Sequence, residues 1–111
     1  MTADQIRVLF VCSRNQWRSP TGETLWRRKG GVKVRSAGTS SAAKRRISAF
    51  DIEWADIIFF METKHKKRVQ QNFRDLLNSV EVHVLDIPDD YGFMDPELVS
   101  IIEAKTEDIL V

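Results

Sequence analysis

Four short stretches of the chain carry the apolar, β-branched and aromatic residues that are typical of strands. They are residues 6 to 11 (IRVLFV), 32 to 35 (VKVR), 56 to 61 (DIIFFM) and 80 to 85 (VEVHVL). The first and third stretches have almost no polar position between their apolar ones, and a strand of that kind is buried on both faces. The pattern therefore predicts the buried strands of a parallel sheet.

Signals for helices separate these predicted strands. A Ser-Pro pair at residues 19–20 combines a residue suited to the N-cap with one suited to the first helical position, which predicts a helix that ends before the Gly-Gly pair at residues 30–31. A basic helix is expected over residues 64–77. An Asp-Pro pair at residues 95–96 repeats the start signal before a closing helix, whose apolar residues recur at helical spacing.

The alternation of strands and helices indicates βαβ units. We therefore expect an α/β fold: a single-domain three-layer sandwich over residues 1–111, with a four-stranded parallel sheet and helices on both of its faces. In such sheets, ligands bind beyond the carboxyl ends of the strands. This rule indicates that the loop after Val11 lies at the functional edge of the protein.

Composition supports one globular domain. The 111 residues are 42% hydrophobic and 30% charged, as in ordinary folded proteins, and the single cysteine, Cys12, excludes an internal disulfide. No run of about 18 apolar residues is present, so neither a membrane span nor a membrane partner is expected. The N-terminus lacks a basic segment followed by a cleavage site, so we expect no signal peptide and a cytoplasmic protein.

Charge is distributed unevenly along the chain. The formal net charge is +1, yet residues 1–74 hold 16 of the 17 basic residues and six of the 16 acidic ones, a net +10, and the remaining residues carry −9. This asymmetry fits an anionic ligand bound on one side, and it fits equally a single domain laced with salt bridges. The basic runs at residues 44–46 and 64–68 are more often solvated faces than nucleic-acid sites, so nucleic acid is not an expected partner.

The most informative segment is residues 8–23, VLFVCSRNQWRSPTGE. Cys12 ends a predicted strand, Arg18 follows six positions later, and the next helix starts directly afterwards. A loop of this length can turn its backbone N–H groups inward and form an anion site at the positive end of the helix. Arg18 can bind two phosphate oxygens, the positive field favours the thiolate form of Cys12, and the Ser19 hydroxyl can donate to that thiolate. The residues expected to bind phosphate are Ser13, Arg14, Asn15, Gln16, Trp17 and Arg18.

The spacing of Cys12 and Arg18 is weak evidence by itself, because ten of the 111 residues are arginines. A lone cysteine at the end of a strand commonly serves as a small buried apolar residue, and an arginine at the start of a helix as a surface residue. A surface arginine is unfavourable here, since the helix dipole repels a cation at that end unless an anion is bound. The strand before the loop and the Ser-Pro pair after it favour a phosphate site.

The segment resembles the phosphate-binding loop of the low-molecular-weight protein tyrosine phosphatases, in which an apolar strand is followed by Cys, x, Gly, Asn, x, Cys, Arg, Ser and Pro. Three later segments resemble that family in the same order along the chain: SAGT at residues 36–39, ADII at 55–58 and DIPDDY at 86–91. The resemblance implies a role for each matched loop residue: nucleophile for Cys12, phosphate clamp for Arg18, loop shaping for Asn15 and hydrogen-bond donor to the thiolate for Ser19.

This chain departs from the family pattern at three places. Arg14 replaces the glycine of the loop. Trp17 stands where many members have a second cysteine, so the reversible disulfide that protects the nucleophile in those members cannot form here. The chain is also shorter than most members between Thr39 and Asp56, a stretch that in the family supplies a helix and part of the wall of the substrate pocket.

The family also carries an Asp-Pro-Tyr sequence whose aspartate is the general acid, whereas this chain reads Pro-Asp-Asp-Tyr at residues 88–91. Alignment on the residues to either side makes Asp89 the match and Asp90 the alternative, with Asp90 and Tyr91 as supporting residues. An aspartate is needed there because the leaving oxygen requires a proton, and the same carboxylate can then activate water. A solvated turn is the other interpretation of this segment.

These observations predict a metal-independent phosphomonoester hydrolase that works through a cysteinyl-phosphate intermediate and needs no cofactor. The resemblance implies protein phosphotyrosine as the substrate class. The expected partners are a phosphorylated protein or a small phosphomonoester, with inorganic phosphate as the product. No metal site is expected, because His65 and His83 have no further ligand at a metal-binding spacing. The alternative is a phosphoprotein- or anion-binding module with the same fold and little or no turnover.

Overall fold

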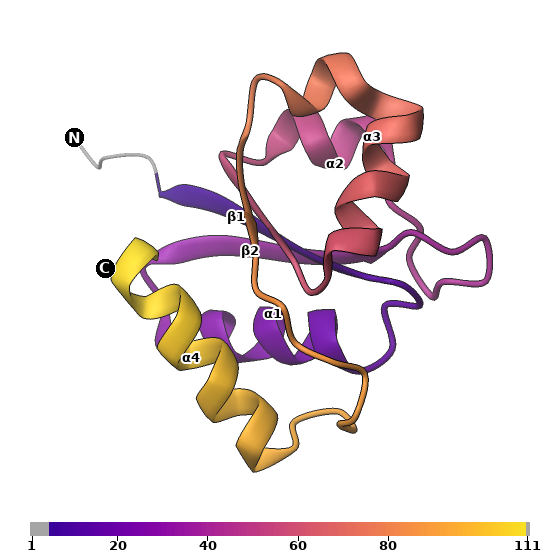
Figure 1. The fold of residues 1–111 in the computed structure, drawn as a ribbon. Helices are drawn as coiled ribbons and strands as arrows, with labels where there is room; N and C mark the ends of the chain where they lie inside the picture. The colour runs from indigo at the N-terminus through magenta and orange to yellow at the C-terminus, as the bar shows by residue number, and fades with distance from the viewer. Residues whose placement is uncertain (1–4, 111) are drawn as a thin grey trace.

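The computed structural model describes residues 5–110, in which helices and strands alternate along the chain (Figure 1). The elements are β1 (Ile6–Cys12), α1 (Arg18–Lys29), β2 (Val32–Gly38), α2 (Ala49–Trp54), β3 (Ile57–Phe60), α3 (Thr63–Leu77), β4 (Glu81–Val84) and α4 (Pro96–Leu110). Within this part of the chain, no helix has the length and apolar character needed to cross a membrane. Residues 1–4 and 111, which include the start of the segment examined for a signal peptide and both limits of the predicted domain, lie outside the described residues.

The four strands form one parallel sheet in the order β2-β1-β3-β4, which confirms the predicted four-stranded parallel sheet. β1 is central, since Cys12 pairs with Gly38 of β2 and Val11 pairs with Phe60 of β3. The chain leaves β1 toward β2 on one side and then reaches β3 on the other side, so the direction of the connections reverses beside β1. Ligands of α/β sheets bind at the carboxyl end of the strands beside such a reversal, which is where β1 ends.

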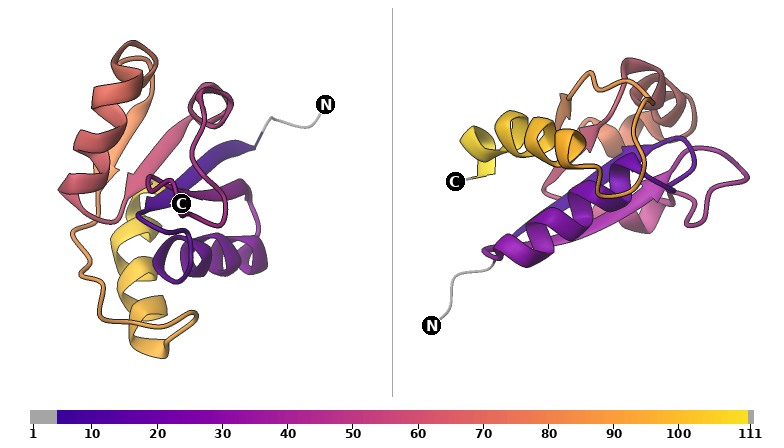
Figure 2. Two further views of the ribbon diagram at one scale, coloured as in Figure 1. Left: turned by 90° about the vertical axis from the view of Figure 1, so that its right-hand side faces the viewer. Right: turned by 90° about the horizontal axis from the view of Figure 1, so that it is seen from below.

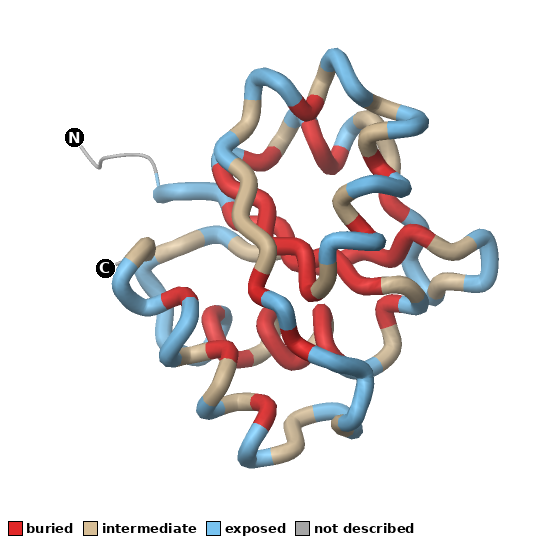
Figure 3. The backbone as a smooth tube through the Cα atoms, in the orientation of Figure 1, coloured by how far each residue is buried: buried red, intermediate tan, exposed pale blue. Residues whose placement is uncertain are grey.

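Helices cover both faces of the sheet, as predicted. α1 and α4 lie on one face, and α2 and α3 lie on the other (Figures 1 and 2). Side chains of β1 alternate between the two layers: Phe10 belongs to the core under α1 and α4, and Leu9 to the core under α2 and α3. Buried residues are concentrated in the sheet and on the sides of the helices that face it (Figure 3). Burial on both faces explains why β1 and β3 are apolar at consecutive positions.

Close packing holds α1 against β1 and α4. A Cβ atom added to Gly22 would lie 2.8 Å from the ring of Phe10, so only glycine lets the helix approach the strand this closely. The indole Nε1 of Trp26 donates to Thr106 Oγ1 at 2.9 Å, and this hydrogen bond ties α1 to α4. The helix that starts at the end of the loop after β1 is therefore fixed along its length.

The start of α1 differs from the prediction. The helix begins at Arg18 with Trp17 as its N-cap, so Ser19 is not the N-cap and Pro20 is not the first helical residue. Pro20 is tolerated at the third helical position because the first N–H groups of a helix have no helical acceptor. The Trp17 side chain makes no capping hydrogen bond, and the Ser19 hydroxyl is free to bond elsewhere.

Two further features of the fold were not predicted. α2 has only six residues, too few to display a helical period, yet Ser48 and Asp51 form a reciprocal capping box at its start. The signal for this helix in the sequence is the Ser-x-x-Asp spacing. β2 also runs to Gly38, past the predicted end at Arg35, because its last residues pair with the last residues of β1.

Candidate active site

The loop between β1 and α1 is held from one side by the segment that follows β2. Three loop carbonyl groups accept backbone hydrogen bonds of 2.8 to 3.0 Å: that of Cys12 from Thr39, that of Ser13 from Ser40 and that of Arg14 from Lys44. In a trans peptide the C=O and the following N–H point in opposite directions. The N–H groups that follow these carbonyls therefore face away from the segment after β2. Within the described residues, no N–H of residues 13–17 donates to another protein group, so these donors are available to an anion.

Two backbone features let the loop adopt this shape. A Cβ atom on Gly38 would lie 2.6 Å from the Ser13 carbonyl oxygen and 2.9 Å from the Asn15 nitrogen, so the end of β2 can pack against the loop only as glycine. Asn15 has a φ of 53°, in the left-handed region that asparagine tolerates better than most residues. The close packing therefore requires glycine at position 38, and the left-handed backbone favours asparagine at position 15.

The sulfur of Cys12 lies at the end of a buried chain of hydrogen bonds. Asn15 Nδ2 donates to Ser19 Oγ at 3.0 Å and to Ser36 Oγ at 2.9 Å, and the Ser36 hydroxyl donates to the Glu23 carboxylate. Because Ser19 Oγ accepts from Asn15, its own proton is available to an acceptor. The Cys12 Sγ, at 2.9 Å, is closer to Ser19 Oγ than the Ala37 carbonyl oxygen at 3.4 Å. The chain of bonds therefore directs the Ser19 proton toward the sulfur.

Arg18 is almost completely buried and is held by groups from two other segments. Its Nη1 donates to the Ile87 carbonyl oxygen at 2.7 Å and pairs with the Glu62 carboxylate, and its Nε lies 3.6 Å from Asp89 Oδ1. Burial opposes ionisation of Glu62, but the hydrogen bond and charge of Arg18 outweigh burial and hold its pKa below the usual value. These partners compensate the cost of a buried guanidinium. Its Nη2 has no partner among the described residues and is left for a ligand.

His65 supports the loop from α3. Its Nδ1 accepts the Glu62 backbone N–H at 3.0 Å, so the neutral ring carries its proton on Nε2, which lies 2.8 Å from Ser13 Oγ and donates to it. Burial, with the nearby charge of Arg18, lowers the pKa of His65 to about 4, and the ring is neutral at pH 7. The Ser13 hydroxyl, once it has accepted this bond, can direct its own proton toward the cavity in front of Cys12.

Glu62 and His65 are site residues that the sequence analysis missed. Their partners, Arg18 and Ser13, lie far away in the sequence, and His65 was considered only as a metal ligand. The spacing of Glu62 and His65 matches that of a capping box at the start of α3, and this signal could have indicated a fixed histidine. Among the described residues, no group of three His, Cys, Asp or Glu side chains is placed to hold a metal ion.

A cavity of about 30 Å³ gathers most of the predicted site residues. It is lined by Cys12, Ser13, Arg14, Gln16, Trp17, Arg18 and Asp89. Asn15 does not line it and lies buried beneath the loop. Of the two candidate acids, Asp89 lines the cavity and Asp90 does not. Tyr91 is also outside it: its hydroxyl donates to the Glu97 carboxylate at 2.6 Å, and this bond raises the pKa of Tyr91 to about 12.

The sequence matches no protein-family model and no curated protein, but the fold closely matches solved structures. The YwlE arginine phosphatase from Geobacillus stearothermophilus is 24% identical, with 94% of this chain and 92% of that chain covered and a TM-score of 0.75. A low molecular weight protein tyrosine phosphatase from T. tengcongensis is 21% identical, with 96% and 100% covered and a TM-score of 0.75. The tyrosine phosphatase Wzb from Escherichia coli K30, in complex with phosphate, is 20% identical, with 94% and 95% covered and a TM-score of 0.75. The chain therefore has the fold that the resemblance implied.

Proposed function

We propose that this chain, which has the fold of the low molecular weight protein tyrosine phosphatases, is a metal-independent phosphomonoester hydrolase that acts on protein phosphotyrosine through a cysteinyl-phosphate intermediate. The observation that carries the proposal is the position of the Cys12 sulfur. It lies 2.9 Å from Ser19 Oγ, in a cavity that Arg18 and Asp89 also line. The proposed phosphatase domain is residues 1–111.

The first chemical step forms the intermediate. The N–H groups of residues 13–17 and the free Nη2 of Arg18 bind the oxygens of the phosphate and neutralise its charge, which removes the need for a metal ion. The Cys12 thiolate attacks phosphorus, so that an S–P bond forms while the bond from phosphorus to the leaving oxygen breaks. Asp89, in its acid form, donates a proton to that oxygen, and the alcohol or phenol leaves neutral.

The second step releases phosphate. The Asp89 carboxylate now takes a proton from a water molecule, whose oxygen attacks phosphorus as the S–P bond breaks. The electron pair of that bond returns to sulfur, and the Ser19 hydroxyl donates a hydrogen bond to the thiolate as it leaves. Inorganic phosphate departs, and Asp89 is protonated again for the next cycle. The position of Asp89 in the lining of the cavity that holds Cys12, which Asp90 does not line, supports this assignment over Asp90.

The rim of the cavity supports an aromatic phosphoester as the substrate. Trp17 lines the cavity and is 44% exposed, and it also borders a neighbouring hollow that contains Phe93. A phenyl ring attached to the bound phosphate can pack on these side chains. The proposed partner is therefore a phosphorylated protein, and small aryl phosphates are the expected model substrates.

We further propose that the protein acts in the cytoplasm. The nucleophile is the only cysteine of the chain, so no second thiol of this chain can protect it by forming a disulfide. A reducing compartment keeps such a thiolate free.

A second candidate is a phosphoprotein- or anion-binding module that keeps the loop but turns over poorly. The side chain of Arg14, which lines the cavity where the family pattern has glycine, favours this alternative. Such a module would bind phosphate through the same loop and Arg18.

Hydrolysis of para-nitrophenyl phosphate in the presence of a chelator tests the proposal. We expect phosphate release that Cys12→Ser abolishes, with phosphotyrosine peptides hydrolysed as well. Phosphoarginine peptides belong in the same assay, because one protein of similar fold is an arginine phosphatase. Binding of inorganic phosphate without turnover of any of these substrates would support the binding module instead.

A further inference from the structure

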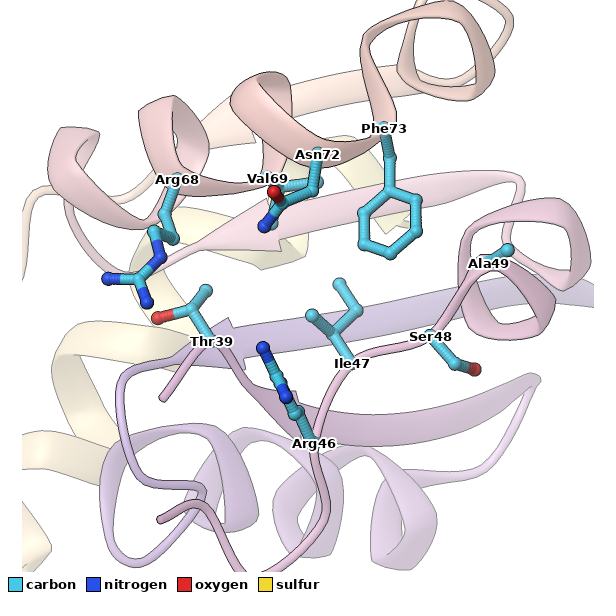
Figure 4. A pocket seen from close by; sticks show the side chains of 9 residues that line it. All are labelled: Thr39, Arg46, Ile47, Ser48, Ala49, Arg68, Val69, Asn72 and Phe73. Carbon is cyan, nitrogen blue, oxygen red and sulfur yellow. The ribbon is translucent and has the colours of Figure 1, made fainter. Parts of the chain in front are cut away.

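A second and larger cavity lies between the segment that leads into α2 and the side of α3 that faces this segment (Figure 4). Its volume is about 350 Å³. Five polar residues line it, Thr39, Arg46, Ser48, Arg68 and Asn72, and Ile47 and Phe73 contribute apolar surface. None of the residues assigned to catalysis belongs to this lining, so the cavity has no role in the chemistry proposed above.

The charge of this cavity is positive and uncompensated. Arg46 and Arg68 come from the two basic runs of the sequence, at residues 44–46 and 64–68, and the fold brings them to the same cavity. No carboxylate lines it, and neither arginine pairs with an acidic side chain among the described residues, whereas the adjacent Arg45 pairs with Asp51. Two guanidinium groups that face one hollow repel each other, and an anion bound between them removes that repulsion.

The apolar part of the lining indicates that the ligand is more than a free ion. Ile47 lies beside Arg46 on the segment before α2, and Phe73 lies across the cavity on α3, the helix that carries Arg68 (Figure 4). α3 has a non-helical conformation at Phe73, with φ −140° and ψ 37°. A volume of this size is at the lower end of the range for ligand sites and exceeds that of a single small anion. The lining therefore fits a side chain with an apolar stem and an anionic end.

The cavity and the catalytic loop are bordered by the same two segments of the chain, the end of β2 and helix α3. Thr39, which lines the cavity, donates its N–H to the Cys12 carbonyl oxygen at 3.0 Å. α3, which carries Arg68, also carries His65, the partner of Ser13. A substrate segment that leaves the catalytic cavity along α3, past His65, therefore passes Arg68 and the second cavity.

We propose that this cavity is a second subsite for the protein substrate, which binds an anionic side chain, a carboxylate or a second phosphate, close in sequence to the residue that is dephosphorylated. The proposal rests on the proposed function and adds to it a substrate class: phosphoproteins with acidic or multiply phosphorylated segments. Arg46 and Arg68 bind the anionic group, and Ile47 and Phe73 contact its stem.

A series of phosphotyrosine peptides tests this subsite. Each peptide carries a single glutamate, phosphoserine or glutamine at one position within four residues of the phosphotyrosine. We expect glutamate or phosphoserine at one or two positions to lower KM by about 5- to 10-fold relative to glutamine, as for a charge-assisted contact. The ranking of glutamate against phosphoserine identifies which of the two anions the site prefers. Equal KM for all peptides would overturn the subsite.

Variants assign the effect to the cavity. Arg46→Gln and Arg68→Gln, each made singly, should weaken the preference for the acidic peptides. Each should leave kcat/KM for para-nitrophenyl phosphate unchanged, because that substrate has no second anion. Arg74→Gln is the matched control, since it removes one exposed charge from α3 outside the cavity. An equal loss in Arg74→Gln would show a general effect of charge and contradict the subsite.

Binding to the Cys12→Ser protein, followed by fluorescence anisotropy of labelled peptides, keeps the test independent of turnover. If no substrate is hydrolysed, the proposed function fails, and a preference for acidic peptides that depends on Arg46 and Arg68 still supports the subsite. A single-stranded oligonucleotide that displaces the peptide at equal concentration, and does so through the same two arginines, would overturn the assignment to a protein substrate.

Discussion

Cys12 has a hydrogen-bond partner in Ser19 and is the only residue of the cavity lining that carries a thiol. The Ser19 hydroxyl lies 2.9 Å from the sulfur, and Arg18 lines the same cavity. Cys12→Ser replaces the thiolate by a hydroxyl that is not ionised at neutral pH, while the anion site remains. We expect turnover of para-nitrophenyl phosphate to fall by more than about 1,000-fold and the affinity for inorganic phosphate, measured by calorimetry, to stay within about threefold. Comparable activity in the variant would exclude the mechanism.

Arg18 differs from the other arginines because it is buried and held at a fixed position. Nη1 and Nε are occupied by Glu62, Ile87 and Asp89, so only a planar group can satisfy these partners and still present a donor to phosphate. Lysine is a point charge and cannot do both. We expect Arg18→Lys to reduce kcat by about 100-fold or more. Arg74→Lys, at an exposed site, is the matched control. A loss of only a few-fold in Arg18→Lys would mean that the planar guanidinium of Arg18 has no specific role.

Asp89 and Asp90 are distinguished by their positions, and kinetics can test the difference. Asp89 lines the cavity and Asp90 does not. General-acid catalysis contributes about 10²- to 10⁴-fold and matters most for a poor leaving group. We therefore expect Asp89→Asn to depress hydrolysis of phosphotyrosine far more than that of para-nitrophenyl phosphate, whose phenolate leaves without a proton. Asp90→Asn should have a small effect that is equal for both substrates, and the reverse pattern would assign the role to Asp90.

Strands and helices were predictable where the sequence repeats a pattern over several residues. β1 and β3 are apolar at consecutive positions because both of their faces are covered, and this signal is local. α2 escaped prediction because six residues carry no period, and the start of α1 was misplaced because Ser19 uses its hydroxyl for Cys12 rather than as a cap. The loop of the site was predictable as a motif. The contact of His65 with Ser13 was not, because it joins residues 52 positions apart.

The start of α3 should give stability a dependence on pH. His65 has a pKa of about 4 in the folded protein, below its usual value near 6.5, so the unfolded chain binds more protons between these two values. The contribution of His65 to the free energy of unfolding should therefore be at its full value above about pH 6.5. It should decline as the pH falls toward 4, by up to about 1.4 kcal/mol per pH unit. Urea unfolding of the protein at pH 7, 5.5 and 4.5 measures this slope.

A variant assigns that slope to His65. His65→Gln keeps a side-chain donor for Ser13 and removes the titrating group, so its stability should vary less between pH 6.5 and 4. His83→Gln, on the edge strand β4, is the control and should retain the slope of the parent. An identical slope in His65→Gln and the parent would show that the acid sensitivity arises elsewhere.

The distribution of charge over the folded molecule separates the two interpretations of the sequence. Among the described residues, only two ion pairs join the basic part of the chain to the acidic part: Arg18 with Asp89, and Lys29 with Glu103. Asp51, Asp56 and Glu62 belong to the basic part themselves, and their basic partners also come from residues 1–74. Pairing between the two parts therefore neutralises little of the excess of positive charge. This balance favours an anionic ligand over a protein laced internally with salt bridges.

The single cysteine makes the whole molecule sensitive to oxidation in a specific way. Trp17 lines the cavity with Cys12, and no other thiol exists in the chain to form a protective disulfide. Peroxide should convert Cys12 to the sulfenic acid, which thiols reduce, and then to the sulfinic acid, which they do not. We expect the fraction of phosphatase activity that dithiothreitol restores to fall steadily with the time of exposure to peroxide. Glutathione present during the exposure should preserve recovery, because it caps the sulfenic acid as a mixed disulfide.

Intact-mass spectrometry distinguishes the sulfenic acid, the sulfinic acid and the mixed disulfide of Cys12. Full recovery of activity after prolonged peroxide without added thiol would contradict an unprotected thiolate at this position.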